Sequence, residues 1–168
     1  MKNLKLPKIG LRNLKTALAV SLCMFIFQIF HRQDSFYACI ASVVCMKDTV
    51  SNSFTMGKNR LIGTFLGGLI GLLVIFLSIT FPLLYNITPI VTGIGIIFSI
   101  YLCTLLNKSA SVIICCIVFI SIMVNHHSGP GSYIYAIMRC IDTTIGITIA
   151  VVINKFVHPP KEKIWNNI

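Results

Sequence analysis

Two charged residues, Arg139 and Asp142, interrupt an otherwise apolar stretch near the C-terminus. On a helix, a spacing of three residues puts both side chains on one face, where they can form an ion pair. A charge at the centre of a membrane span costs about 2.5–3.5 kcal/mol or more, so such residues are functional by default. The pair either locks helices together or forms an anion site. In that site Arg139 would hold a carboxylate, which a guanidinium fits bidentately, and Asp142 would tune it or accept a proton.

The same pattern occurs 79 residues earlier in the chain. Each run has an arginine, then a threonine, a glycine and a small residue at four, seven and eleven positions later. The runs are Arg60, Thr64, Gly67 and Gly71, and then Arg139, Thr143, Gly146 and Ala150. The last three positions share one helix face, and small residues there let helix backbones approach closely. We therefore predict that the glycines of this face pack helices together, with a narrow path as a compatible role: Gly63, Gly67, Gly71 and Gly146.

Arg60 begins the first of these two runs, and two interpretations of it stay open. Many arginines at this kind of position extend their guanidinium to the membrane interface. The alternative is an anion-attracting ring at the inner mouth of the bundle. Its other members would be Lys58, Arg12 and Lys15.

The other polar residues indicate no catalysis. Arg32 and Asp34 are interpreted as ordinary turn residues, and His126 and His127 as a solvated loop or, alternatively, a pH-sensitive gate. No hydrolase, metalloprotease or phosphate-loop motif occurs, and the seven cysteines form no CxxC pair. We predict no enzyme activity, no catalytic residues, no metal and no cofactor. The net charge of +10 is spread thinly, so no nucleic-acid partner is predicted.

The composition indicates that lipid is the solvent of this chain. Hydrophobic residues make up 56% of it and charged residues only 11%, against about 25% charged in soluble domains. A membrane-spanning helix needs about 17–25 apolar residues, and continuous apolar runs exclude strands. The prediction is an all-α membrane protein with a six-helix transmembrane domain over residues 1–158 and a short cytoplasmic tail over 159–168. The spans are about 14–30, 35–54, 61–81, 87–106, 109–124 and 133–157.

The basic residues predict the orientation of these spans. With the N-terminus inside, twelve of the fourteen lysines and arginines fall on the cytoplasmic side, as positively charged loops prefer. Both termini are therefore predicted to be cytoplasmic. Because the two arginine runs lie three spans apart, they run in opposite directions, which predicts an inverted 3+3 repeat of the kind found in secondary transporters.

Several segments resemble the membrane domain of the aromatic acid exporter, or fusaric-acid-resistance-like (FUSC), family. They are residues 10–19, 36–46, 57–71 and 139–146. The resemblance implies a six-helix module that forms a homodimer and exports aromatic carboxylic acids; plant malate channels look like distant relatives. By that analogy the candidate substrate-pathway residues are Arg60, Thr64, Arg139, Asp142 and Thr143.

The leading hypothesis is a transporter that exports small organic anions across a bacterial plasma (inner) membrane. Its predicted partners are the lipid bilayer and a second copy of the same chain. An anion channel of the same fold needs the same residues but no alternating exposure. A membrane assembly subunit without transport is the hypothesis from another class. A membrane enzyme rests only on the two adjacent histidines.

Overall fold

The computed structural model describes residues 10–32, 34–81, 87–125 and 131–157. Within these residues the chain forms six α-helices and one short 3₁₀-helix, and no strand occurs among them. The elements are α1 (Leu11–Ile29), α2 (Phe36–Cys45), α3 (Val50–Thr80), α5 (Thr88–Leu105), η1 (Ser109–Ser111), α6 (Val112–Val124) and α7 (Gly131–Phe156). The predicted all-helical class is therefore confirmed for the described part of the chain.

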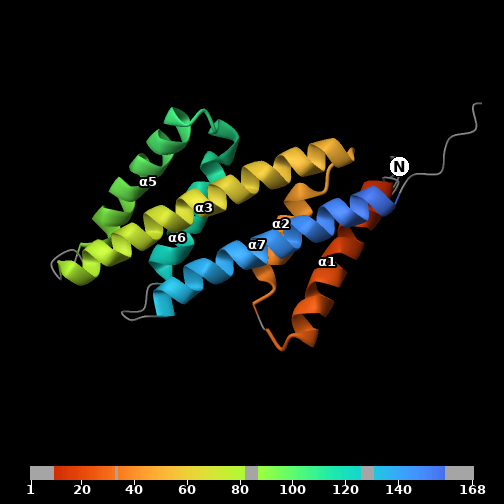
Figure 1. The fold of residues 1–168 in the computed structure, drawn as a ribbon, viewed down its shortest axis with the longest axis horizontal. Helices are drawn as coiled ribbons and strands as arrows, with labels where there is room; N and C mark the ends of the chain where they lie inside the picture. Colours follow the sequence, from red (N-terminus) through yellow and green to blue (C-terminus); the bar gives the residue numbers. More distant parts are fainter. Residues whose placement is uncertain (1–9, 33, 82–86, 126–130, 158–168) are drawn as a thin grey trace, which may run out of the picture.

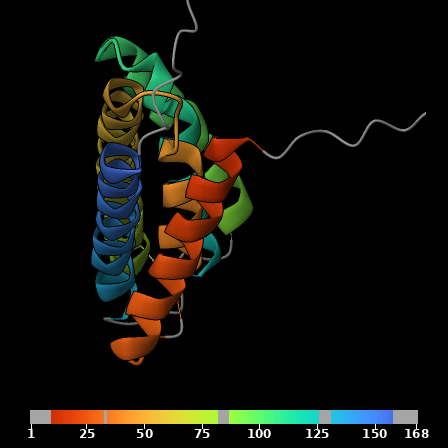
Figure 2. The same ribbon diagram turned by 90° about the vertical axis from the view of Figure 1, so that its right-hand side faces the viewer.

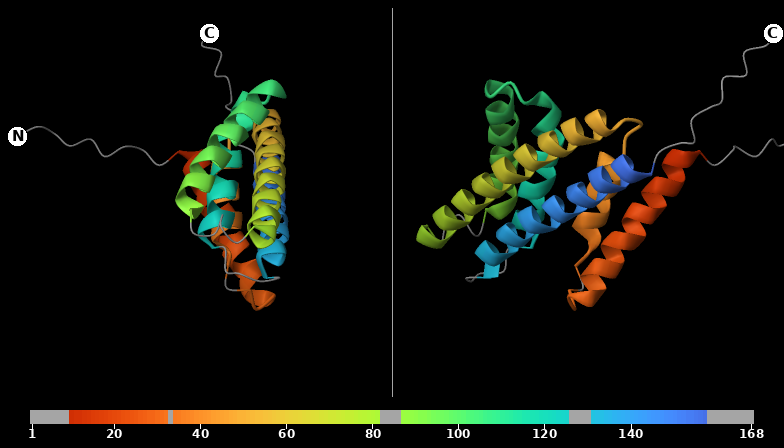
Figure 3. Two further views of the ribbon diagram at one scale, coloured as in Figure 1. Left: turned by 90° about the vertical axis from the view of Figure 1, so that its left-hand side faces the viewer. Right: turned by 45° about the vertical axis from the view of Figure 1, so that its right-hand side comes forward.

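The helices lie in two layers. The two long helices α3 and α7 run side by side in one layer, and the shorter α5, α6, α2 and α1 form the other (Figures 1, 2 and 3). The long helices are antiparallel, because Gly57 lies against Ile147 near the start of α3 and Gly68 lies against Cys140 further along it. We call the end of the bundle where α1 begins and α7 ends the termini end, and the opposite end the far end.

Each long helix packs mainly on a short helix from the other half of the chain. α3 contacts α6 more extensively than its sequence neighbour α2, and α7 contacts α2 more extensively than its neighbour α6. α1 lies against α2 and α7, while α5 lies against α6 and α3. The first three helices and the last three are thus interlocked, and neither group buries its apolar faces alone.

Glycines make this interlocking possible. A methyl group added at Gly67 would meet the backbone carbonyl oxygen of Cys115 on α6, and one added at Gly146 would meet that of Ala38 on α2. At Gly63 the added carbon would lie 2.7 Å from the carbonyl oxygen of Ser111. Backbone therefore lies against backbone, as the small-residue face of each run predicts.

The boundary between the second and third helices differs from the prediction. The expected span over residues 35–54 is instead divided, because α2 ends at Cys45 and residues from Val50 onward belong to the 31-residue α3. The side chain of Thr49 accepts a hydrogen bond from the Asn52 backbone N–H at 3.2 Å. Such an N-cap satisfies one of the free donors of the first turn, and it starts a new helix where a more polar continuation of the preceding helix was predicted.

The helices suit a lipid environment. Three of those in the described part of the chain are long and apolar enough to cross a membrane, namely Val50–Thr80, Thr88–Leu105 and residues 133–156 of α7.

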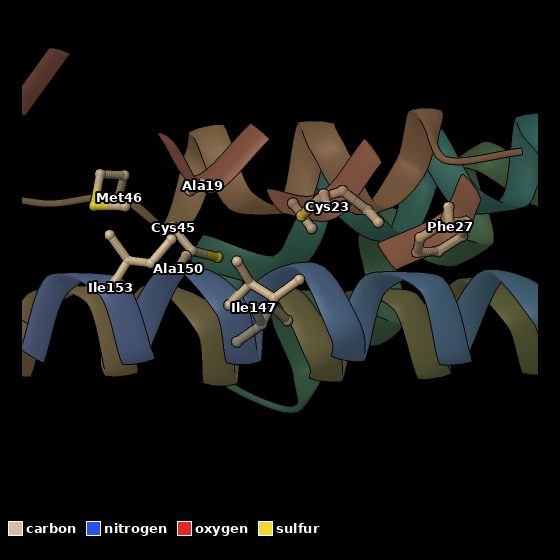
Figure 4. Close-up of a cluster of buried hydrophobic side chains, with 11 residues drawn as sticks. Ala19, Cys23, Phe27, Cys45, Met46, Ile147, Ala150 and Ile153 are labelled. Carbon is tan, nitrogen blue, oxygen red and sulfur yellow. The ribbon is translucent and has the colours of Figure 1, made fainter. Parts of the chain in front are cut away.

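Between α1, α2 and α7 lies a core of small and branched side chains, several of which Figure 4 shows. Many large apolar residues remain exposed, among them Phe65 and Ile97, as expected for surfaces that face lipid tails.

A buried polar cluster fastens the termini end. The Lys15 ammonium donates to Asn154 Oδ1 at 3.1 Å, which links α1 to α7. Asn154 Nδ2 in turn donates to Lys47 O at 2.9 Å and to Ser53 Oγ at 2.8 Å. One side chain therefore joins α1, α7, α3 and the connection between α2 and α3.

The Asn154→Leu variant should unfold at a lower temperature than the parent protein in detergent. It leaves the buried Lys15 ammonium and the Lys47 carbonyl without these partners, and each unsatisfied buried group costs about 1–3 kcal/mol. Asn13→Leu, at an exposed site on α1, is the matched control and should change the melting temperature little. Equal melting temperatures for the two variants would contradict a fastening role.

Candidate functional site

The predicted pair of Arg139 and Asp142 forms the centre of a charged cluster near the far end. Arg139 Nη2 lies 3.2 Å from Asp142 Oδ2, and Arg32 Nη1 lies 2.9 Å from Asp142 Oδ1. Asp34 Oδ2 completes the cluster at 3.9 Å from Arg139 Nη2. The interpretation of Arg32 and Asp34 as ordinary turn residues is therefore wrong, because both bond to α7 across more than a hundred residues of sequence.

Aromatic rings cover the guanidinium of Arg139. Its central carbon lies 3.8 Å from the ring centre of Tyr37 and 4.6 Å from that of Tyr135, both within the range of cation–π attraction. The two tyrosine hydroxyls meet at Ser121 Oγ, at 2.5 and 2.9 Å. These three residues join α2, α6 and α7, although the backbones of α2 and α6 do not touch in the described chain. None of these three residues was predicted from the sequence. The one available signal was the position of Tyr135, one helical turn before Arg139.

The buried charges of this cluster are one guanidinium and one carboxylate, because Arg139 and Asp142 are buried whereas the Arg32 side chain is 31% exposed. The Asp34 side chain is 78% exposed and Asp142 is fully buried, so water screens the first carboxylate but not the second. Two guanidiniums therefore share one buried carboxylate.

Arg60, the repeat counterpart of Arg139, lies in a different environment. It is only 8% exposed, so its guanidinium does not extend to the interface as the first interpretation required. Among the described residues none of the ion pairs includes it, and its Nε has no hydrogen-bond partner. The buried hydroxyls of Thr64, on the same helix face, and of Ser111, which lies against Gly63, likewise have no partner.

The expected ring around Arg60 is not assembled. Lys58 is exposed, Lys15 bonds to Asn154, and Arg12 pairs with Asp48 at the surface at 3.4 Å. Thr143, which is the repeat counterpart of Thr64, is buried. It follows Asp142 directly in the sequence. His126, His127 and the tail over 159–168 lie outside the described residues.

The buried charged residues of the described chain are mostly cations. They are Lys15, Arg60, Arg139 and Asp142. The buried interior of the described chain therefore holds three positive groups and one carboxylate, and of the three only Arg139 is paired with that carboxylate. In the described ranges no group of three histidine, cysteine or acidic side chains could hold a metal ion. An interior with this balance of charge is better suited to an anion than to a cation.

A family model described as "Aromatic acid exporter family member 1" matches residues 7–157. The chain belongs to this family. Two curated relatives are the UPF0421 protein BH2644 of Halalkalibacterium halodurans, 28% identical over 94% of this chain, and the UPF0421 protein OB2406 of Oceanobacillus iheyensis, 27% identical over 90%. The aligned region covers 42% and 41% of their lengths, so this chain spans about two fifths of each relative. No solved structure matches it.

Membership of the aromatic acid exporter family confirms the resemblance that the sequence indicated. It agrees with the apolar helices in making this a membrane protein of a transporter family. It also agrees with the expectation that the chain is not an enzyme, since the family is named for export.

Proposed function

We propose that this protein transports small organic anions, most suitably aromatic carboxylates, across a bacterial plasma membrane. The observation that carries the proposal is the excess of buried positive charge, three cations against one carboxylate in the described chain. An uncompensated charge in a low-dielectric interior is costly, and an anionic substrate that neutralises it recovers that cost. The name of the family, aromatic acid exporter, supports the same substrate class.

Arg60 is the proposed substrate-binding arginine. Its guanidinium is buried, lacks a carboxylate among the described residues, and shares its helix face with the unpartnered Thr64 hydroxyl. A guanidinium and a hydroxyl are donors that a carboxylate can accept together. Arg139 is already paired with Asp142 at 3.2 Å. We therefore propose that Arg139 stabilises the fold when no substrate is bound.

The inverted repeat remains part of the proposal, and the helix contacts support it. In such a repeat α1 corresponds to α5, α2 to α6 and α3 to α7. The contact of α3 with α6 then has its counterpart in the contact of α7 with α2, and the contact of α1 with α2 has its counterpart in that of α5 with α6. α1 and α5 also end alike, with left-handed His31 and Asn107. The next residue of each donates its N–H to a carbonyl five positions back, at 2.9 Å, as in a Schellman motif. In our proposal both termini face the cytoplasm, and the homodimer is retained as an expectation from the resemblance.

The Arg60→Gln variant should lose most of its saturable uptake of benzoate into inverted membrane vesicles. Loss of a charge-assisted hydrogen bond to a carboxylate is worth about 1.5–3 kcal/mol, which corresponds to roughly tenfold or more in affinity. Lys58→Gln removes an exposed charge two positions away and should leave uptake near the parent level. If folded Arg60→Gln protein takes up benzoate at the parent rate, the proposed role of Arg60 is wrong.

The same measurement separates the alternatives. A carrier saturates with benzoate concentration and responds to a pH gradient, whereas a channel carries flux that rises with voltage and does not saturate at low concentration. A membrane assembly subunit moves no substrate in proteoliposomes. The internal pairing of Arg139 with Asp142 is the observation that keeps this last alternative open.

A further inference from the structure

A small cavity lies near the far end, between the last turn of α1 and α7. Its volume is about 280 Å³, and its described lining consists of Ile26, Phe27, Phe30, Arg32 and Ile145. Of these five side chains only Arg32 is charged. The volume falls just below the range of about 300–1,000 Å³ typical of pockets for drug-sized ligands, so an occupant must be small.

The end of α1 fixes the position of Arg32 in this cavity. His31 adopts a left-handed conformation with φ of 51°, and the Arg32 N–H donates to Phe27 O at 2.9 Å. This Schellman-type ending places the Arg32 guanidinium 5.2 Å from the centre of the Phe27 ring. A cation and an aromatic surface are thus held side by side.

The Arg32 guanidinium can take a second anion. Its ion pair with Asp142 uses Nη1, whereas a guanidinium carries five N–H donors, and the side chain is 31% exposed. Asp142 has a second partner in Arg139 at 3.2 Å. The negative charge of Asp142 therefore remains paired with Arg139 when Arg32 turns towards another carboxylate.

We propose that this cavity is a binding site for a small aromatic carboxylate, with the carboxylate on Arg32 and the ring against Phe27 and Phe30. The site is separate from Arg60, which does not line the cavity, and rests on the proposed function for its substrate class. The bound carboxylate accepts from the Arg32 donors that the ion pair through Nη1 does not use. Asp142 and the ligand then compete for Arg32, so that occupation of the cavity loosens the link between α7 and the end of α1.

Binding of radiolabelled benzoate to purified protein in detergent tests the proposal, with Arg60→Gln as the background so that only the far-end site is measured. We expect saturable binding in this background, competition by unlabelled benzoate, and no competition by the neutral isostere benzamide. Adding Arg32→Gln should weaken benzoate binding at least about tenfold, as loss of a charge-assisted bond implies.

Aromatic variants test the ring contact. Phe30→Ala in the same background should weaken benzoate binding severalfold without unfolding, because Phe30 lines the cavity from an exposed position. Phe25→Ala is the matched control, an exposed phenylalanine of α1 outside the cavity. Equal effects of the two variants would overturn the site.

Two further outcomes separate this site from the proposed function, and a third tests the aromatic assignment. If the parent protein binds and transports benzoate but the Arg60→Gln background binds none, the far-end site is wrong and the transport proposal stands. If the parent protein neither binds nor transports benzoate, the proposed function fails as well. If octanoate displaces benzoate with equal affinity, the cavity accepts an acyl chain, and the aromatic assignment is wrong.

Discussion

The Asp142→Asn variant should lower the melting temperature of the detergent-solubilised protein by an amount on the order of 10 °C. The carboxylate is fully buried and lies 2.9 Å from Arg32 and 3.2 Å from Arg139. Removing one partner of a buried ion pair costs about 3–5 kcal/mol because the other charge is left uncompensated. For a chain of this size each kcal/mol corresponds to about 2–4 °C. Here Arg139 keeps only the more distant Asp34 carboxylate.

The control for this prediction is the same substitution at a surface pair. Asp48 lies 3.4 Å from Arg12, and its side chain is 76% exposed. Exposed pairs contribute about 0–1 kcal/mol, so Asp48→Asn should shift the melting temperature by a few degrees at most. Thermal unfolding followed by circular dichroism compares the two variants directly. Similar shifts would mean that burial does not set the strength of the Asp142 pairs.

The Gly146→Ala variant should destabilise the protein even though alanine is the better helix former. An alanine methyl group at this position would meet the carbonyl oxygen of Ala38 and lie 2.8 Å from the Ala41 side chain. Neither can move without shifting α2 away from α7. Overpacking of this kind costs about 1–3 kcal/mol, which exceeds the gain of about 1 kcal/mol from replacing a helical glycine.

Two other glycines should respond in the opposite direction. A methyl group at Gly68 would have only the Cys140 sulfur nearby, at 3.9 Å, and one at Gly93 would meet nothing within 4 Å. Gly68→Ala and Gly93→Ala should therefore leave the melting temperature unchanged or raise it. The decisive result is that the melting temperature falls for Gly146→Ala but does not fall for Gly68→Ala and Gly93→Ala. A uniform response would show that close backbone contact does not matter here.

Local spacing predicted part of this site, and tertiary packing determined the rest. The pairing of Arg139 with Asp142 followed from three residues of separation on one helix, which depends on helix geometry alone. Their bonds to Arg32 and Asp34 depend on how the end of α1 lies beside α7, and no periodicity encodes that. The burial of Arg60 depends equally on which helices cover its face.

The fold was predictable to a similar degree. Continuous apolar runs predicted helices in the right places, and small-residue spacing indicated which faces pack closely. The break between α2 and α3 was missed because the polar residues that follow Met46 were interpreted as a more polar continuation of the same helix. The signal was present in Thr49, whose side chain caps the start of α3; its effect became clear only once Cys45 was found to end the preceding helix.

The interlocked helices also have a consequence for how the protein is made. When the ribosome has completed α3, the face that carries Gly63 and Gly67 still lacks its partner, because α6 has not been synthesised. The first three helices must therefore wait in the bilayer with polar residues such as Arg60 unshielded. We expect polypeptides truncated before α6 to be retained by insertion machinery or degraded by membrane proteases.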